Sequence, residues 1–241
     1  MDLNLTRQLE NDFDNNIETL LDGKNHFIYN EPNTDFLYYN QDKLAINCVG
    51  NSLLVRSFDK RLLDELEETY FDFPAPWFME MDNIFKLQNI LKKYDMSLKN
   101  MDPIMAPRLN FTKFESDYEF KRIDKKDYDK FKGLVKFAFS CDDGASDDKL
   151  VLSYYDDEKL IAIARVSRNS KYLWDIGVEK FDFSPKYREV TPILINNLTV
   201  LAQKENPDIT VIYTSQFSHV NSINLAISAG YRLAFSFILG G

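Results

Sequence analysis

The sequence is poor in the residues that build metal sites and disulfide frameworks. Its 241 residues include only two cysteines, Cys48 and Cys141, and two histidines, His26 and His219, with no two of them close together. Zinc centres usually need four cysteine or histidine ligands, and small secreted scaffolds need several cysteine pairs. The sequence therefore predicts neither a metal site nor a secreted domain held by disulfides.

Positive charge and long apolar runs are also scarce. The chain carries 29 basic and 38 acidic residues, so its net charge is −9. This excess opposes nonspecific binding to nucleic acid or anionic membranes, although one basic pocket for a phosphorylated ligand remains compatible with it. No apolar run approaches the roughly 20 residues of a membrane span, and the first residues do not read as a secretory leader. We therefore expect a cytoplasmic protein that binds neither nucleic acid nor membrane.

What the sequence does contain is typical of a folded globular protein. Hydrophobic residues make up 44% and charged residues 28% of the chain, which argues against disorder. The aromatic share of 14% predicts a core packed largely by rings. A chain of this length can form one large domain or two smaller ones, each with its own core.

The first half predicts helices that alternate with strands. Apolar residues at helical spacing predict a helix over residues 3–22 that ends near Gly23. Asp59 is expected to cap a helix over residues 60–70. Prolines 103 and 107, with the polar residues that follow them, predict a linker. The other expected elements are a helix over residues 84–94 and strands over residues 36–39, 44–48, 53–57, 77–81 and 96–101.

The second half predicts a longer alternating series, which indicates a layered α/β fold with domains over residues 1–112 and 113–241. Residues 141–148 are expected to form an acidic loop, which either is simply exposed to solvent or attracts a cationic substrate. The element order of residues 53–101 repeats that of residues 172–238. The first half is therefore either a degenerate copy of the second or an unrelated, smaller α/β domain. The expected strands cover residues 118–123, 150–155, 160–166, 172–181, 209–214 and 231–238, and the helices residues 126–139, 191–204 and 220–229.

Three features of the second half together resemble the GNAT superfamily of N-acetyltransferases. One is the order of strands and helices. Another is W-D-I-G-V at residues 174–178 with P-K-Y-R at residues 185–188, which is similar to the family's central strand and P-x-Y-R turn. The last is S-I at residues 222–223 with G-Y at residues 230–231, similar to a late helix and final strand. The resemblance implies a GNAT-like mixed central sheet flanked by helices, and acyl transfer from acetyl-CoA to an amine.

In this family a turn at a helix N-terminus holds the CoA pyrophosphate, because free N–H groups and the helix dipole favour an anion there. The resemblance places Arg188, Glu189, Val190, Thr191 and Ile193 in that turn. Thr191 and Ile193 stand where the family has a glycine and a second small residue, and Glu189 adds a repulsive charge. Thr191 is still expected to cap the helix. Arg188 either contacts phosphate or pairs with a surface acid.

The resemblance implies further cofactor contacts outside this turn. Phe181 and Phe183 continue the central strand and either touch the cofactor or belong to the core. His219 stands at the family's usual asparagine and Ser222 at a small polar position, so both are cofactor-binding candidates. For His219 the alternative is a helix cap or a surface position. Ala226 replaces a tyrosine that often protonates the departing thiolate, so water or another group must do this.

A general base is also required, because an amine must lose a proton when it attacks a thioester. Asp175 and Glu179 lie four residues apart on the central strand and so face the same side of the sheet, which makes both catalytic candidates. The alternative is that they face solvent or form ion pairs. The resemblance also places Tyr213 and Ser215 where the cleft opens.

The sequence thus predicts an N-acetyltransferase that uses acetyl-CoA as co-substrate and acts on a small amine or a peptide. Two alternatives remain open. The fold could serve as a non-catalytic sensing or interaction module with an eroded pyrophosphate turn. It could also serve as a structural homodimer that pairs through the apolar stretch at residues 235–241.

Overall fold

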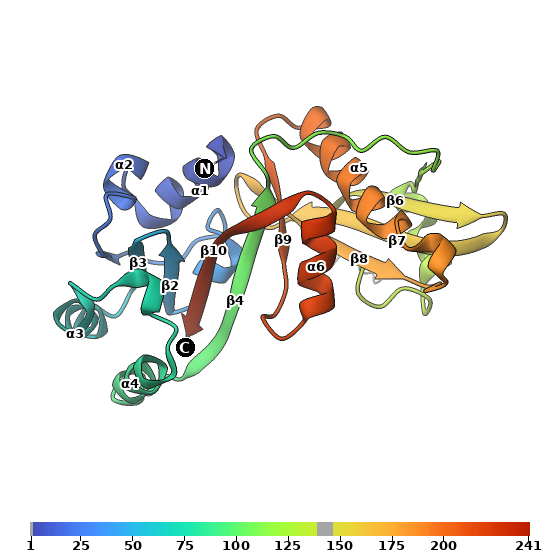
Figure 1. Ribbon diagram of the computed structural model, residues 1–241. Helices are drawn as coiled ribbons and strands as arrows, with labels where there is room; N and C mark the ends of the chain where they lie inside the picture. The colour runs from blue at the N-terminus through green and yellow to red at the C-terminus, as the bar shows by residue number, and fades with distance from the viewer. Residues whose placement is uncertain (1, 139–146) are drawn as a thin grey trace. The chain divides into compact units, whose positions relative to one another are not determined.

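The computed structural model describes residues 2–138 and 147–241, which form two compact units (Figure 1). The first unit contains Met1–Ile104, Ser170–Tyr172 and Leu233–Gly241, and the second contains Met105–Asn169 and Leu173–Arg232. Residues 233–241, which the sequence assigned to a second domain, therefore cluster with the first unit. Within the described residues, no helix combines the length and the apolar character needed to cross a bilayer.

The first unit packs helices against a short mixed sheet. Strand β3 pairs in parallel with β1 and antiparallel with β2, and β2 pairs antiparallel with β10. Leucine-rich faces of two helices, α3 and α4, pack on this sheet around Phe78 and Tyr70. The elements are α1 (Leu3–Phe13), α2 (Ile17–Leu20), β1 (His26–Tyr29), η1 (Tyr38–Asn40), β2 (Leu44–Val49), β3 (Ser52–Ser57), α3 (Lys60–Tyr70), η2 (Ala75–Trp77), α4 (Met81–Lys92), β4 (Leu98–Pro107) and β10 (Tyr231–Gly240).

Local signals in the first unit were partly correct. Asp59 caps α3 as expected, since its carboxylate accepts the N–H groups of Arg61 at 3.0 Å and Leu62 at 3.3 Å. The single helix expected over residues 3–22 is wrong, because Asp14 takes a left-handed conformation (φ 45°) that ends α1. The strands expected over residues 36–39 and 77–81 are wrong as well, since a 3₁₀ turn begins at Tyr38, a second one ends at Trp77, and α4 begins at Met81. Residues 103–107, expected in a linker, continue strand β4.

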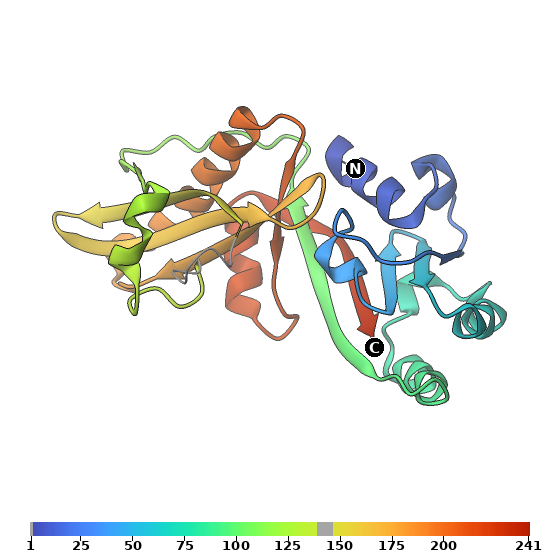
Figure 2. The ribbon, with the colours of Figure 1, turned by 180° about the vertical axis from the view of Figure 1, so that it is seen from behind.

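The second unit has a mixed sheet with a helix layer on each face. Strands β5 to β8 are antiparallel neighbours in sequence order, and β9 joins β8 in parallel. Helices α5 and α6 cover one face, and η3 covers the other (Figures 1 and 2). The elements are β5 (Lys121–Arg122), η3 (Lys125–Phe131), β6 (Asp148–Asp156), β7 (Lys159–Arg168), β8 (Leu173–Lys180), η4 (Pro185–Tyr187), α5 (Val190–Glu205), β9 (Thr210–Thr214) and α6 (Val220–Ser228).

The predicted α/β fold, a mixed central sheet flanked by helices, is confirmed by this architecture. The hairpin, the central strand and both late helices lie where the sequence pattern placed them. The helix expected over residues 126–139 is wrong, because only Lys125–Phe131 coils, as a 3₁₀ helix, and Gly133 takes a positive φ of 78°. Most of the expected acidic loop, including Cys141, lies outside the described residues, while Asp148 begins β6.

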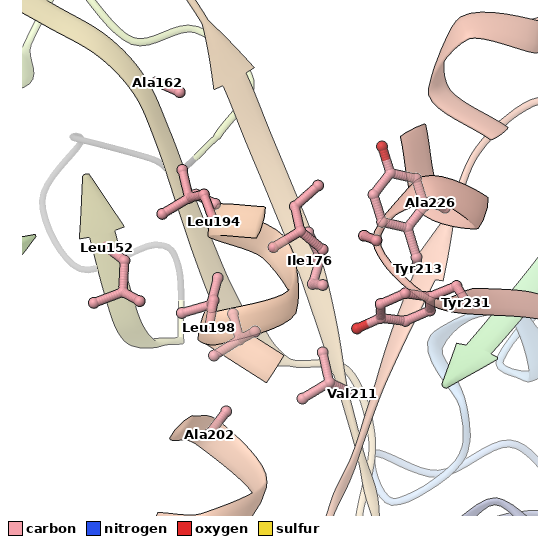
Figure 3. Packing of buried hydrophobic residues seen from close by; sticks show 14 of the residues in the cluster. Leu152, Ala162, Ile176, Leu194, Leu198, Ala202, Val211, Tyr213, Ala226 and Tyr231 are labelled. Atoms are coloured by element: carbon pink, nitrogen blue, oxygen red, sulfur yellow. The ribbon is translucent and has the colours of Figure 1, made fainter. Parts of the chain in front are cut away.

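The larger core cluster of the second unit lies under α5 and α6 (Figure 3). Asn196 of α5 is fully buried beside it and connects three segments through hydrogen bonds. Its Oδ1 accepts the N–H of Phe114 at 2.8 Å, and its Nδ2 donates to the carbonyls of Thr112 at 3.0 Å and Ala229 at 3.3 Å. This amide therefore fixes residues 112–114 and the end of α6 on α5.

Replacing Asn196 with alanine should lower the free energy of unfolding by about 2–4 kcal/mol, because buried backbone groups lose their partners. Chemical denaturation monitored by circular dichroism measures the change. Asn197→Ala is the matched control, since this neighbour makes one bond to the Ile193 carbonyl within the same helix. Equal losses of stability in the two variants would contradict the conclusion that Asn196 fixes residues 112–114 and the end of α6 on α5.

Candidate functional site

The site begins where β8 and β9 separate. Their parallel pairing ends at Asp175 and Ile212, although β8 continues to Lys180. The Phe181 N–H bonds to the Ile161 carbonyl of β7 at 2.8 Å. Because successive residues of a strand point their backbone groups in opposite directions, the N–H and C=O of Val178 point away from β7. One edge of β8 therefore offers backbone groups that β9 does not use.

A cavity of about 720 Å³ opens beside this edge. That volume lies in the range of small-molecule and cofactor sites. All of the described residues that line it belong to the second unit. They come from the segment after η3, from β8, the turn before α5, the first turn of α5, the end of β9, and α6 with its cap: Phe137, Ile176, Gly177, Val178, Lys180, Phe183, Arg188, Thr191, Tyr213, Thr214, His219, Asn221, Ser222 and Leu225.

Five of the predicted site residues line this cavity, namely Phe183, Arg188, Thr191, His219 and Ser222. The other six do not line it, and they take ordinary structural places in or beside the sheet. Val190 is buried in the core under α5, Ile193 is half-buried, and Phe181 packs on the opposite face of the sheet. Glu189 is exposed. Asp175 and Glu179 belong to β8 but are not among the residues that line the cavity.

The turn before α5 is held from outside the cavity. The Tyr187 hydroxyl donates to the Asp156 carboxylate of the β6–β7 hairpin, and Lys186 pairs with the same carboxylate at 2.9 Å. Lys180 Nζ donates to the Tyr187 carbonyl at 2.8 Å, and burial lowers the pKa of this ammonium. The exposed Arg188 guanidinium lies 3.8 Å from the Glu189 carboxylate. A fixed turn thus presents cations to the cavity.

The first turn of α5 offers donors at the cavity wall. The helix begins at Val190, and its cap position, Glu189, makes no side-chain capping bond. The expectation that Thr191 caps the helix is therefore wrong. The backbone N–H of Ile193 bonds back to the Glu189 carbonyl at 3.2 Å, so the N–H groups of residues 190 and 191 precede the helical ladder.

Thr191 carries the clearest sign of a ligand. Its side chain is only 3% exposed, yet its hydroxyl has no hydrogen-bond partner in the part of the chain that the structure describes. Buried hydroxyl groups in native proteins are almost always bonded. Thr191 is one of the residues that line the cavity, and its buried hydroxyl lies in the first turn of α5, at the positive end of the helix dipole. The arrangement is suited to an anionic ligand with acceptor oxygens.

The two carboxylates of β8 have different environments. Burial raises the pKa of Asp175 to about 6, and Oγ1 of Thr214, which lines the cavity, donates to its carboxylate at 3.2 Å. Glu179 Oε2 instead accepts the N–H groups of Lys136 at 2.7 Å and Phe137 at 3.0 Å. Asp175 can therefore exchange a proton with the cavity through Thr214, whereas Glu179 holds a neighbouring segment.

Tyr213 supplies a buried hydroxyl on the other side of β9. Its Oη lies 2.8 Å from Ser222 Oγ of α6, and burial raises its pKa. The ring packs in the same cluster as Ala226 and Tyr231 (Figure 3). Because Tyr213 and Thr214 are consecutive strand residues, they reach the cavity from opposite faces of the sheet.

Sequence reasoning missed several lining residues, above all Thr214, Lys180 and Phe137. Thr214 directly follows Tyr213 at the end of a strand, and Lys180 ends the central strand, so their positions gave a weak signal. Phe137 gave none, because it was assigned to a helix. Ser215, expected at the opening, has a buried hydroxyl and is not part of the lining.

No protein-family model matches the sequence, and a comparison with curated proteins found no match. Solved structures show distant likenesses. A protein of Novosphingobium aromaticivorans described as a GNAT-family acetyltransferase is 18% identical, with a TM-score of 0.43 over 61% of this chain and 67% of its own. A GNAT-family acetyltransferase of Colwellia psychrerythraea is 13% identical, with a TM-score of 0.44 over 59% of this chain and 56% of its own.

A GCN5-related N-acetyltransferase-like protein of Streptococcus suis is 14% identical, with a TM-score of 0.42 over 80% of this chain and 82% of its own. The chain thus spans just over half of the Colwellia protein and most of the Streptococcus protein. Likenesses this distant give no residue a role, so roles must come from the cavity itself.

Replacing Thr191 with valine should leave the free energy of unfolding unchanged or raise it by up to about 1 kcal/mol. Valine has nearly the same shape and removes a buried hydroxyl that lacks a partner. Thermal unfolding without ligand measures this effect. Thr199→Val is the matched control and should destabilise, because the Thr199 hydroxyl bonds to the Ile195 carbonyl and to Tyr231. A clear loss of stability in Thr191→Val would mean that the hydroxyl has an internal partner.

Proposed function

We propose that the second unit is an acyltransferase that takes an acyl group from acetyl-CoA or a related acyl-CoA and passes it to an amine. The observation that carries the proposal is a cavity where β8 and β9 separate, lined by Thr191 at the start of α5, whose buried hydroxyl has no partner among the described residues. Pyrophosphate is an anion rich in acceptor oxygens, which helix N-termini bind well. The element order and the P-K-Y-R turn, which resemble those of N-acetyltransferases, support the same assignment.

The cavity residues fit the parts of an acyl-CoA. The Thr191 hydroxyl and the free N–H groups of residues 190 and 191 would bind the pyrophosphate, with Lys180 and Arg188 supplying positive charge. The backbone of Val178 would bond the pantetheine arm or the acyl carbonyl along the open edge of β8. Bound in this way, the substrate presents a thioester to the point where the two strands part.

The chain's own groups can move the two protons that the reaction requires. As the amine nitrogen bonds to the acyl carbon, its proton passes to Thr214 Oγ1 while Thr214 gives its own to Asp175. As the carbon–sulfur bond breaks, the sulfur takes a proton from Tyr213 Oη, which Ser222 holds in place. Tyr213 would thus replace the tyrosine that the family resemblance places at Ala226.

The rival hypothesis is a non-catalytic module that keeps the fold. Two observations favour it: Arg188 pairs with Glu189, and Pro192 in the first turn of α5 lacks an N–H group. Both weaken a phosphate site relative to a glycine-rich turn. The proton path from the cavity to Asp175 favours the enzyme, since a sensing module has no need of it.

Calorimetric titration with acetyl-CoA tests the binding half of the proposal. We expect micromolar binding of acetyl-CoA, and similar binding of desulfo-CoA because the phosphates supply most of the anchoring. Arg188→Ala should weaken both by about tenfold, the equivalent of one charge-assisted hydrogen bond. Arg122→Ala is the control, since it removes an exposed guanidinium that pairs with Glu205 outside the cavity. Absence of heat and of thermal stabilisation at millimolar acetyl-CoA would favour the non-catalytic module.

The pH dependence of thiol release tests the catalytic half. Asp175 accepts a proton only when ionised, and its pKa is raised to about 6. The rate should therefore rise about tenfold per pH unit below pH 6 and level off above it. Asp175→Asn should abolish this rise of the rate with pH, together with most of the activity. Thr214→Val should lower the rate at every pH, because it removes the hydroxyl that connects Asp175 to the cavity.

Tyr213→Phe should lower the rate above pH 6 by about 10²-fold or more, the usual contribution of a general acid. The pH at which the rate levels off should stay near 6. Tyr231→Phe is the matched control, because its hydroxyl bonds to Thr199 in the same cluster and does not line the cavity. A profile that stays flat from pH 5 to 8 would rule out Asp175 as the base. Equal rates in the two tyrosine variants would rule out Tyr213 as the donor.

A further inference from the structure

The rim of the cavity carries two large aromatic rings in solvent. Phe137 is 77% exposed and Phe183 is 80% exposed, and both line the cavity. A single exposed apolar side chain needs no explanation. Two of them at the edge of one cavity form an apolar rim, which is a common feature of ligand sites.

The two rings belong to different parts of the site. Phe183 lies in the turn between β8 and α5, beside Lys180, whose ammonium is 5.8 Å from the ring centre. It therefore shares the side of Arg188 and Thr191, where the phosphates of the proposed acyl-CoA would bind. Phe137 comes from residues 132–138, whose buried members pack on the opposite face of the sheet, the face covered by η3. Of the two rings, that of Phe137 comes from outside the proposed phosphate site, so it is the ring available to the acceptor.

The chain holds the backbone of Phe137 in place. Glu179 Oε2 accepts the N–H groups of Lys136 at 2.7 Å and Phe137 at 3.0 Å. Val135 and Ala138, on either side, are buried in the core cluster of this face. Phe137 is thus the exposed ring of a segment that is anchored before it, at it and after it.

Gly177 makes the close approach of this segment feasible. A β-carbon at this position would lie 2.2 Å from the Ala138 carbonyl oxygen and 2.9 Å from Arg165 Nε. Any side chain at residue 177 would push the segment off β8, and the Phe137 ring with it. Gly177 and Glu179 are two residues apart on the same face of β8. One strand therefore supplies both the space that the segment needs and the carboxylate that holds it.

The charges that line the cavity narrow the class of acceptor. Lys180 and Arg188 supply positive charge, and no carboxylate is among the described residues that line the cavity. Among the described residues, this lining offers no countercharge to an acceptor with several positive charges. The Phe137 ring offers instead a face for stacking or apolar contact.

We propose that Phe137, held by Glu179, is the acceptor-binding residue of the cavity, and that the acceptor is a primary amine on an aromatic or other apolar skeleton. This inference rests on the proposed acyltransferase function. It makes Glu179 a positioning residue and leaves Asp175 as the base. The acceptors that it disfavours are polyamines and other polycations.

Three amines test the acceptor class, with release of the CoA thiol from acetyl-CoA as the readout. Phenethylamine carries a ring, ethylamine is the same amine without the ring, and spermidine is a polycation. We expect the highest kcat/KM for phenethylamine. Phe137→Ala should raise its KM about tenfold or more, in the range for loss of an apolar contact, and should change kcat/KM for ethylamine less than about twofold. Phe137→Leu should restore part of the lost affinity.

Variants of Glu179 test whether its hydrogen bonds to Lys136 and Phe137, here called the clamp, hold the Phe137 ring in place. Glu179→Ala should raise the KM for phenethylamine as Phe137→Ala does while kcat changes little, and Glu179→Gln, which keeps an acceptor oxygen, should have an intermediate KM. A collapse of kcat in Glu179→Gln would make Glu179 a base and overturn the clamp. Phe85→Ala, which removes a 60% exposed ring in the first unit, is the control and should leave all parameters unchanged.

Calorimetry with acetyl-CoA separates the two possible failures. Acetyl-CoA should bind Phe137→Ala and the unaltered protein equally well. If it does, and acceptor preference is independent of Phe137 or favours spermidine, this inference is wrong while the acyltransferase proposal stands. If acetyl-CoA does not bind the unaltered protein, the acyltransferase proposal fails and the acceptor assignment fails with it.

Discussion

The end of the β8–β9 pairing at Asp175 and Ile212 is the constraint on which the second unit's site depends. Beyond that point β8 still bonds to β7, so it stays straight enough to present one free edge. The cavity occupies the space that β9 leaves, and α5 begins at its wall. Without this divergence the backbone of Val178 would bond to a neighbouring strand, and no ligand could reach it.

The fold was predictable where the pattern was long and periodic. Helix α3 with its Asp59 cap, the β6–β7 hairpin and the order from β8 to β10 all follow from spacing and turn residues. The errors occurred where tertiary contacts override local preference. Residues 132–138 are apolar enough for a helix, yet their backbone groups bond to Glu179 and pack over Gly177. Nothing local in the sequence encodes a partner more than 40 residues away.

The site was predictable only as far as the family resemblance reached. It identified Arg188, Thr191 and Ser222, which do line the cavity, and it identified the loss of a tyrosine at Ala226. It could not supply Thr214, whose importance comes from a hydrogen bond to a carboxylate on a neighbouring strand. It could not show either that the Thr191 hydroxyl is buried without a partner among the residues that the structure describes, because that depends on everything packed around α5.

Asp175, Gly177 and Glu179 show how one strand face can hold three unlike functions. The sequence makes the two carboxylates equivalent, since both follow the same alternation on β8. Their environments make them different: Asp175 is buried beside a hydroxyl that reaches the cavity, and its pKa is raised, whereas Glu179 is bound by two backbone N–H groups. The two bonds to Glu179 hold the segment that carries Phe137, whereas Asp175 is bonded by a hydroxyl of a residue that lines the cavity. A raised pKa in a carboxylic acid that bonds to a residue of the cavity wall is what proton transfer near neutral pH requires. Gly177 lies between the two carboxylates, and only a residue without a side chain there lets the segment held by Glu179 cross the strand that also carries the proposed base.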